Sequence, residues 1–518
     1  MFGLEKLGYK IEIPPSEVDA DLAIPAFKLD KEKAVQLIKA LNNPLISEVK
    51  IFGNYVNIKL NTDNLAPLII QDILKQKDKY GANKDNHGKT VIIEYSSPNI
   101  AKPMHIGHMR NTLLGNALKN IYKANGYKVV TANYIGDWGT HIGKVLLAHQ
   151  KWPEIAKQDL FGLYVKISQE IEKNPDLENE AKELFKKLEE GDKKLRKIWE
   201  KFCDFSIKDF KKVYKILGVS FDLWNGESFY QPFIKDILKE VLSKGIAVQE
   251  KNGPVVVELK PLPSFLLQKS DGASLYSARD LALARWRLEK YKPEKIIYVA
   301  GHEQELYFKQ IFETLRLLGY SKDKFLHVSY GIVTLGGEKM STRKGHAVFL
   351  EDVLKSAIKK AKNDKVIGIG AVIYNTLAQS NERGISFNWD QILNLSGNSA
   401  PYIQYGYVRA LGILNKTKLP DPSTLKKLVF VEEHEIKLIK MLAFFPEMIK
   451  QACHLNSPHI IANYLNSLVQ EFNRFYNNNL VLEAPGNIRW SRLMLVETVA
   501  QVIKNGLCLL GIQTPKKM

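Results

Sequence analysis

Cysteine is scarce in this 518-residue chain, and its scarcity excludes two classes of site. The three cysteines, Cys203, Cys453 and Cys508, lie far apart and are odd in number. Isolated cysteines cannot build a zinc cluster or a disulfide framework, and free thiols are typical of a reducing compartment. We therefore expect a cytoplasmic protein without zinc.

Long hydrophobic runs and an excess of acidic residues are also missing. No apolar run approaches the length of a membrane span, and residues 1–21 are too acidic and interrupted for a signal peptide. The chain has 74 Lys and Arg against 56 Asp and Glu, a formal net charge of +18. This charge favours a polyanionic partner, with a membrane surface as the alternative. The length predicts several domains.

The most informative segment, residues 94–108, reads Glu-Tyr-Ser-Ser-Pro-Asn-Ile-Ala-Lys-Pro-Met-His-Ile-Gly-His. It follows a β-branched run at 90–93 that is typical of a buried parallel strand, and it precedes helical spacing at 109–125. Phosphates bind at such turns because backbone amides and the helix dipole favour negative charge. His105 and His108 can donate to triphosphate oxygens, and Gly107 allows close approach. Alternatively, both histidines merely cap the helix.

A second segment, residues 336–345, is a glycine-bounded loop rich in Lys, Ser and Thr. It follows a strand-like stretch at 325–333 and precedes a helix expected to begin near Leu350. Flexible backbone, hydroxyl donors and point charges suit a mobile phosphate clamp. Taken alone, the segment is better explained as a solvated basic surface loop.

Together the two segments resemble the HIGH and KMSKS signatures of class I aminoacyl-tRNA synthetases, in the form found in arginyl-tRNA synthetases. The Gly-Asp-Trp-Gly turn at 136–139 and the closing residues 510–518 also resemble that family. The turn is expected to line the floor of the site, whereas residues 141–143 mimic HIGH without its second histidine and are interpreted as a decoy. The resemblance implies ATP, with Mg²⁺ bound to it, as a substrate. It implies catalytic roles for His105, His108, Lys102 and Lys339, and ATP contacts for Gly107, Met340, Ser341 and Lys344.

The chain departs from the common KMSKS pattern at Thr342, where the second lysine usually stands. In arginyl-type enzymes the lysine before HIGH, here Lys102, is thought to compensate. We therefore expect Lys102, Lys339 and Lys344 to share the stabilisation of transition-state charge, with Ser341 as a hydroxyl donor.

A pocket selective for arginine needs carboxylates and neutral acceptors, because a guanidinium carries a permanent charge and a planar fork of donors. Such groups stand at strand ends and on the adjoining helices. Ligands of open α/β sheets bind at these strand ends. By resemblance, Tyr276, Asp280 and Gln304 hold the arginine side chain, and Glu94 and Asn99 lie nearer its α-amino group. Each has an alternative: Asp280 can pair with Arg279 or Arg285, and Gln304 can face water.

The pattern of elements predicts three domains. Residues 1–88 read as a small α+β domain, with a helix at 30–42, a hairpin at 49–60 and a helix at 66–77. By resemblance this domain contacts the elbow of transfer RNA, and a purely structural role is the alternative. Residues 89–395 read as a Rossmann-type α/β core, with a helical insertion at 152–257 and the sheet resuming at 274–282. We expect the insertion's aromatic residues to form its core rather than to stack on bases: Trp199, Phe202, Phe205 and Phe210.

Residues 396–518 have the apolar spacing of a helical bundle. By resemblance this all-α domain binds the anticodon. Tyr402, Tyr405 and Arg409 offer aromatic faces and a cation suited to splayed single-stranded bases. The alternative is that the tyrosines belong to the core of the first helix.

The sequence therefore predicts a monomeric arginyl-tRNA synthetase. Arginine would attack the α-phosphorus of ATP to give arginyl-adenylate, and the 3′-terminal ribose of tRNA(Arg) would then take the arginyl group. Two alternatives remain: a class I synthetase for cysteine, glutamate or glutamine, and a non-catalytic RNA-binding relative. Three scattered cysteines cannot build the zinc thiolate site that a cysteine enzyme needs, and a glutamate pocket should present cations where Glu94 and Asp280 stand. The retained histidines and Lys339 argue against the non-catalytic relative.

Overall fold

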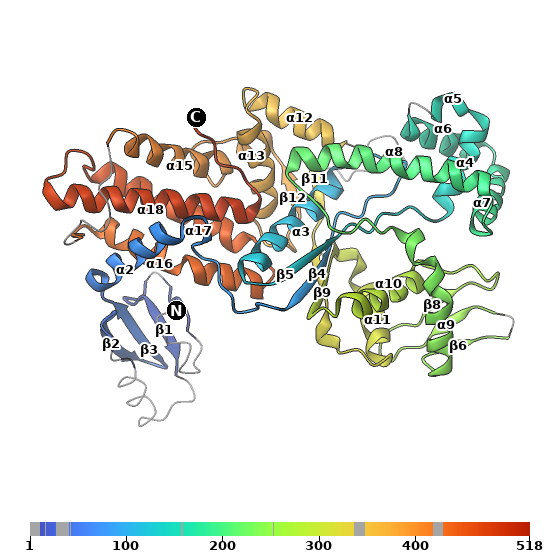
Figure 1. Cartoon of the computed structure of the whole chain (residues 1–518), viewed down its shortest axis with the longest axis horizontal. Coiled ribbons are helices and arrows are strands. Elements are labelled where there is room, and N and C mark those ends of the chain that lie inside the picture. Colours follow the sequence, from blue (N-terminus) through green and yellow to red (C-terminus); the bar gives the residue numbers. More distant parts are fainter. Residues whose placement is uncertain are drawn as a thin grey trace. The chain divides into compact units, whose positions relative to one another are not determined.

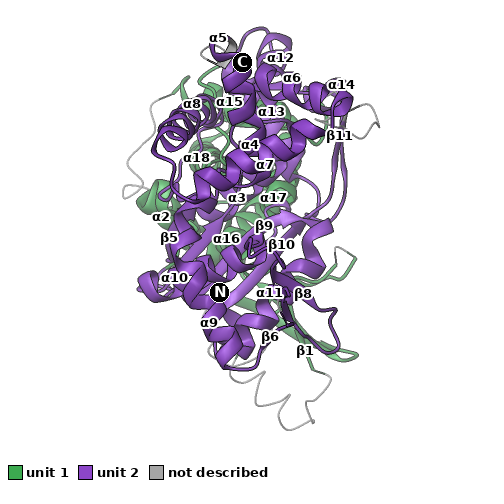
Figure 2. Ribbon diagram, turned by 90° about the vertical axis from the view of Figure 1, so that its right-hand side faces the viewer, with its two compact units in different colours: residues 1–83, 394–455, 460–518 green, residues 84–393, 456–459 purple. Residues whose placement is uncertain are grey.

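A computed structural model describes residues 11–15, 17–26, 41, 43–156, 159–251, 253–335, 348–417 and 428–518. The chain forms two compact units (Figure 2). The catalytic unit comprises residues 84–393 and 456–459, and the second unit comprises residues 1–83, 394–455 and 460–518. The second unit thus combines the N-terminal and C-terminal parts of the chain.

The catalytic unit is built on a four-stranded parallel sheet in the order β10-β9-β4-β5 (Figure 1). Its strands are β4 (Thr90–Glu94), β5 (Lys128–Ala132), β9 (Lys295–Gly301) and β10 (Phe325–Tyr330). The doubly wound α/β fold predicted from the sequence is confirmed. Since the chain leaves β4 toward β5 on one side and β9 lies on the other, the sheet has a switch point beside β4, where such folds bind ligands.

Helices connect these strands and place their N-termini at the carboxyl edge of the sheet. They are α3 (Ile106–Ala124) after β4, α10 (Tyr276–Tyr291) before β9, and α11 (Glu305–Leu317) between β9 and β10. The expected resumption of the sheet at 274–282 is wrong, because α10 begins at Tyr276 and buries Ala278, Leu281 and Ala282 at helical spacing. One face of α10 therefore packs against the sheet.

The insertion is mainly helical, as expected. Helix α4 (Thr140–Lys151) directly precedes the insertion. The insertion contains α5 (Pro153–Ala156), α6 (Leu160–Lys173), α7 (Asp176–Glu189), α8 (Lys193–Leu217), the 3₁₀ helix η3 (Glu227–Phe233) and α9 (Ile234–Ser243). A small antiparallel sheet follows, formed by β6 (Ala247–Gln249), β7 (Val255–Val257) and β8 (Phe265–Gln268). Trp199, Phe202 and Phe210 are buried as predicted, whereas Phe205 is 37% exposed and does not belong to the core.

The stretch 325–333 is not one strand. β10 ends at Tyr330, and β11 (Val333–Leu335) pairs in parallel with β12 (Ile385–Phe387) in a separate two-stranded sheet. Helices α12 (Leu350–Lys360) and α13 (Lys365–Leu377) precede β12, and α14 (Trp389–Ile392) follows it. The helix expected near Leu350 is confirmed.

The second unit contains an antiparallel sheet and a helical bundle. The sheet has the order β1-β3-β2, from β1 (Leu22–Pro25), β2 (Ile46–Phe52) and β3 (Tyr55–Leu60), and it leads into α2 (Thr62–Gln76) and η2 (Lys77–Lys79). The predicted helix at 30–42 lies outside the described residues. The bundle consists of α15 (Ala400–Leu414), α16 (Glu433–His454), α17 (His459–Asn478) and α18 (Gly486–Leu510).

By length and composition, helix α18 is long and apolar enough to cross a membrane. The expectation that no apolar stretch approaches a membrane span is therefore wrong for this helix. Of its most apolar stretch, 72% is buried inside the protein. It packs against α15 and α16, and such burial is typical of the core helix of a bundle.

Candidate functional site

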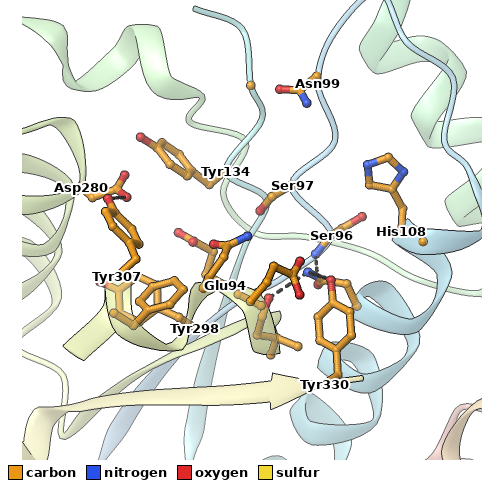
Figure 3. Close-up of a pocket in the computed structure, with 18 of the residues that line it drawn as sticks. Glu94, Ser96, Ser97, Asn99, His108, Tyr134, Asp280, Tyr298, Tyr307 and Tyr330 are labelled. Atoms are coloured by element: carbon orange, nitrogen blue, oxygen red, sulfur yellow. Dashed lines mark hydrogen bonds between the residues drawn. The ribbon is translucent and has the colours of Figure 1, made fainter. Parts of the chain in front are cut away.

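A cavity of about 860 Å³ opens at the carboxyl ends of β4 and β9 in the catalytic unit. Figure 3 shows Asp280 and Tyr307 at one side of it, His108 at the other and Glu94 between them. Eight residues singled out in the sequence line this one cavity: Glu94, Asn99, His105, Gly107, His108, Tyr276, Asp280 and Gln304. The residues Lys339, Met340, Ser341 and Lys344 lie outside the described residues.

The turn between β4 and α3 is strained and tightly held. Ser96, Ser97 and Ala101 have φ values of +75°, +48° and +59°, which residues with a side chain rarely adopt. The backbone N–H of Ser96 donates to Oδ1 of Asn111 at 2.6 Å, and that of Ser97 donates to Oδ1 of Asn133 at 3.1 Å. Such strain persists where the surroundings over-determine it, which is typical of ligand-binding turns.

The two histidines cap α3. Nδ1 of His105 accepts from the N–H of Gly107 at 3.1 Å, and Nδ1 of His108 accepts from the N–H of His105 at 3.1 Å. The alternative reading of these residues as caps therefore describes this structure correctly. A neutral imidazole that accepts at Nδ1 carries its proton on Nε2, so each ring retains an N–H donor.

Burial keeps both imidazoles neutral. It lowers the pKa of His105, and it lowers that of His108 to about 3, with the charge of Lys102 acting in the same direction. His141 is different: its Nε2 lies 3.1 Å from the carbonyl oxygen of Gly136, and His141 is not among the described residues that line the cavity. This placement agrees with its interpretation as a decoy.

Residues 348–350, which follow the second signature, contact the first signature. The N–H of Ile106 donates to the carbonyl of Val348 at 3.1 Å, and the N–H of Leu350 donates to that of Met104 at 2.9 Å. His105 and Phe349 thus form an antiparallel bridge. Residues 348–350, which follow the second segment along the chain, therefore lie beside the histidines.

Lys102 is not one of the described residues that line the cavity. Its ammonium lies 4.5 Å from the ring centroid of Tyr164 on α6. A cation over an aromatic face is attracted by the ring quadrupole. Lys102 therefore stands outside the lining but close enough for its charge to lower the pKa of both histidines.

Asp280 forms the acidic end of the cavity. Its Oδ2 accepts a hydrogen bond from the hydroxyl of Tyr307, while its Oδ1 is buried and has no hydrogen-bond partner among the described residues. Burial raises the pKa of Asp280 to about 6. The alternative pairings are not made, because Arg279 pairs with Glu227 and Arg285 pairs with Glu240 and Glu289. Among the described residues, Asp280 thus has no ion pair and faces the cavity.

Aromatic rings and an amide surround this carboxylate. Tyr276 is 55% exposed at the mouth, with its ring centroid 5.2 Å from that of Tyr307. Tyr134 lines the wall near Asp280 (Figure 3), and Gln304 begins α11 on the cavity side. Together they offer planar faces and neutral acceptors to a guanidinium.

Glu227 is a second carboxylate of this end, and sequence reasoning missed it. It lines the cavity from η3, lies 3.6 Å from Arg279, and burial raises its pKa to about 8. Asp137 holds the start of η3, since its Oδ1 and Oδ2 accept from the N–H and hydroxyl of Ser228 at 2.8 and 2.7 Å. No local pattern marks Glu227, because it belongs to a turn far along the chain from the other site residues.

The Gly-Asp-Trp-Gly turn lines the cavity only in part. Gly136 lies so close to Asn99 that an added Cβ would meet its Oδ1 at 1.9 Å. Asp137 supports Ser228 instead, and Trp138 packs against Phe185 and Trp199 in the insertion. Glycine at 136 thus makes room for the Asn99 amide.

Glu94 stands between the two ends of the cavity and pairs with a buried cation. Its Oε2 lies 2.6 Å from Nη2 of Arg287 on α10. Burial raises the pKa of Glu94, and the charge of Arg287 opposes that rise.

In the second unit, the residues predicted to bind tRNA lie on one surface of α15 and α17. The guanidinium of Arg409 stands 4.8 Å from the ring centroid of Tyr405 and 4.9 Å from that of Tyr476. Asn473 donates to the hydroxyl of Tyr402 at 3.0 Å. Tyr405 is 39% exposed and Tyr402 is half-buried, so neither belongs to the helix core. Sequence reasoning missed Tyr476, which stands at helical spacing from Asn473 on the same face.

Two family models match the chain. Residues 69–389 match the tRNA synthetases class I (R) catalytic domain, and residues 403–518 match the DALR anticodon binding domain. The chain is 39% identical over 552 residues to the arginine–tRNA ligase of Halothermothrix orenii, and the match covers 99% of this chain and 96% of that protein. It is 40% identical to the arginine–tRNA ligase of Clostridium botulinum strain Loch Maree, with the same coverage.

Solved structures agree with these matches. The arginyl-tRNA synthetase of Thermus thermophilus superposes with a TM-score of 0.83 at 25% identity, over 100% of this chain and 98% of that one. The fold is also that of the Plasmodium falciparum arginyl-tRNA synthetase, with a TM-score of 0.82 at 23% identity over 98% and 95% of the two chains.

Proposed function

Since the chain belongs to the arginyl-tRNA synthetases and attaches arginine to transfer RNA, we propose roles in this reaction for the individual residues of the cavity. The observation that supports these roles is the order of polar side chains along the cavity. Asp280 stands at one end, Glu94 in the middle and His108 at the other end. Arginine carries its guanidinium, ammonium and reactive carboxylate in the same order. Burial raises the pKa of Glu227, and Asp280 lies close enough for its charge to raise that pKa further.

At the acidic end, Asp280 binds the guanidinium in charge-assisted hydrogen bonds, with Glu227 as a second carboxylate. Tyr276 covers the planar group, and Gln304 supplies a neutral acceptor. Glu94 and Asn99 bind the α-ammonium group. The carboxylate of arginine then faces the histidines, where the α-phosphate of ATP must lie for in-line attack.

The first chemical step forms the bond between the arginine carboxylate oxygen and the α-phosphorus and breaks the bond to pyrophosphate. His105 and His108 donate their Nε2–H groups to the phosphate oxygens on which negative charge builds up. Lys102, Lys339 and Lys344 share the remaining charge stabilisation. Lys102 reaches the phosphates by leaving Tyr164, and Gly107, Met340 and Ser341 contact ATP.

In the second step a terminal ribose hydroxyl of the transfer RNA attacks the carbonyl carbon of arginyl-adenylate and releases AMP. The substrate is ATP with Mg²⁺, held largely by triphosphate oxygens and water. The described residues contain no group of three or more His, Cys, Asp or Glu side chains able to hold a metal ion. The ion thus enters with the nucleotide.

Residues 89–395 carry the catalysis, and residues 396–518 bind the anticodon, with Tyr402, Tyr405 and Arg409 stacking on bases. Residues 1–88 contact the tRNA elbow. The enzyme acts as a cytoplasmic monomer and binds no membrane, because its partners are soluble polyanions and a small cation.

Arginine-dependent ATP–pyrophosphate exchange, measured with and without total tRNA and with a panel of amino acids, tests the proposal. We expect exchange with arginine and none with glutamate, glutamine, cysteine or citrulline. Exchange with citrulline equal to that with arginine would contradict the roles of Asp280 and Glu227, because citrulline lacks the positive charge.

A further inference from the structure

Arg287 lies behind the wall of the cavity and has no role in the steps above. Its side chain is 1% exposed, and it is not one of the described residues that line the cavity. It stands seven residues after Asp280 on α10, so the two side chains leave the helix on nearly the same face. Within the described part of the chain, its ion pair is with Glu94, at 2.6 Å.

The pair is not well satisfied as a structural contact. Nε and Nη1 of Arg287 are buried without hydrogen-bond partners among the described residues, as are Oε2 of Glu94, which Arg287 contacts only as an ion pair, and the hydroxyl of Tyr298. A buried ion pair with unsatisfied donors is weak evidence for stabilisation, because desolvation offsets its Coulomb energy. The pair is better explained by what it does to Glu94, whose carboxyl also lines the cavity.

Glu94 needs a counter-ion to stay ionised at this position. Burial raises its pKa, and Arg287 is the group that lowers it. Among the described residues, the other titratable groups that face this carboxyl are Asp280 on α10, Tyr298 on β9, Tyr230 on η3 and Tyr134 after β5, and none of these is a cation. A protonated Glu94 would offer an ammonium no negative charge.

We propose that Arg287 is a positioning residue for the α-ammonium group of arginine. It keeps Glu94 ionised and fixes its Oε2, so that the rest of the carboxylate faces the ligand. Arg287 touches no substrate and acts through Glu94. The inference rests on the role proposed above for Glu94.

Two ligands separate this role from a general structural one. Arginine carries the α-ammonium, whereas 5-guanidinopentanoate is arginine without it and should compete for the same pocket. In ATP–pyrophosphate exchange with total tRNA present, Arg287→Met should raise the KM for arginine about 10- to 100-fold. The KM for ATP and the inhibition constant of 5-guanidinopentanoate should not change.

The pH profile gives a second measurement. In Arg287→Met, kcat/KM for arginine should rise about tenfold per pH unit until Glu94 ionises. In the wild type, where Arg287 holds Glu94 ionised, the profile should show only the rise near pH 6 that follows from Asp280 and should be flat above it. Arg287→Lys restores a positive charge and should restore most of the affinity and the wild-type profile. If Arg287→Met does not fold, Arg287→Lys is the variant to measure. It should show a smaller rise in the KM for arginine and no rise in the inhibition constant of 5-guanidinopentanoate.

Glu94→Gln is the reference that separates the two proposals. If Glu94→Gln raises the KM for arginine and a folded Arg287→Met does not, the inference is overturned while the role of Glu94 stands. If Arg287→Met weakened the binding of arginine and of 5-guanidinopentanoate equally, the inference would also be overturned, because this result would indicate general damage to the pocket. If Glu94→Gln itself leaves the KM for arginine unchanged, the role of Glu94 and this inference both fail.

Discussion

Nδ1 of His108 accepts a hydrogen bond from the backbone N–H of His105 at 3.1 Å, and this contact reconciles two readings of the same residues. As caps, the histidines use Nδ1 to satisfy the first N–H groups of α3. As phosphate ligands, they need a donor, and the same bond places the proton on Nε2. Capping therefore prepares the rings for catalysis.

Replacing His105 by Asn should separate these two roles. Asn is a good N-cap and keeps an acceptor for the N–H of Gly107, so the melting temperature should change little. The Nε2–H donor is lost, and the rate of adenylate formation should fall about 10²- to 10³-fold. Single-turnover formation of arginyl-adenylate and a thermal melt measure the two effects. His87→Asn, at an exposed histidine, is the matched control. A wild-type rate in His105→Asn would reduce the histidine to a cap.

The stability of the protein should depend on pH through His108. Burial lowers its pKa to about 3 in the folded state, against 6.5 unfolded. Between these values the unfolded state binds more protons, so stability falls as the pH drops below about 6.5, by at most about 1.4 kcal/mol per pH unit for this group. Guanidinium unfolding at pH 7.5 and 5.5 should show a smaller pH effect in His108→Gln than in the wild type. Equal pH effects would contradict a neutral buried His108.

Removing the carboxylate of Asp280 should abolish most arginine binding. In Asp280→Asn the KM for arginine should rise about 10²-fold or more, since a buried charge-assisted contact is worth several kcal/mol. The KM for ATP should stay near its wild-type value. Pyrophosphate exchange at varied arginine and varied ATP measures both constants. A matching rise in both would indicate general damage to the site.

The hydroxyl of Tyr307 should set the pH range of arginine binding. Burial raises the pKa of Asp280 to about 6, and the hydrogen bond from Tyr307 opposes that rise. In the wild type, kcat/KM for arginine should therefore fall as the pH drops through 6. Tyr307→Phe removes the donor, so the pKa of Asp280 should rise and the fall should move to higher pH. An unshifted profile would show that Tyr307 does not act on Asp280.

Arg409 should contribute to tRNA binding and not to amino-acid activation. Arg409→Met removes the cation held between Tyr405 and Tyr476, and the KM for tRNA should rise about 5- to 30-fold. Exchange at saturating tRNA should be unchanged. Arg474→Met, at an exposed arginine on the same helix as Tyr476, is the control. Equal effects of the two substitutions would indicate a loss of general charge attraction only.

The sequence predicted the parts of the site that local patterns encode. The strand, turn and helix at 90–125 follow from β-branched residues, a Ser-Ser-Pro-Asn turn and helical spacing, and they place Glu94 and His105 together. Glu227 and Arg287 were not predicted, because their roles depend on contacts between distant segments. The helix that begins at Tyr276 was not predicted because its first residues favour neither helix nor strand. Strands β10 and β11 were predicted as one strand because their apolar runs adjoin in the sequence.

A crystal structure with a non-hydrolysable analogue of arginyl-adenylate tests the central claim most directly. The guanidinium should lie within about 3 Å of the Asp280 carboxylate and face Glu227, as expected for a charge-assisted hydrogen bond. The α-ammonium should lie at Glu94 and the phosphate-mimicking group at Nε2 of His105 and His108. A guanidinium bound away from Asp280, or an adenine ring in its place, would contradict the account.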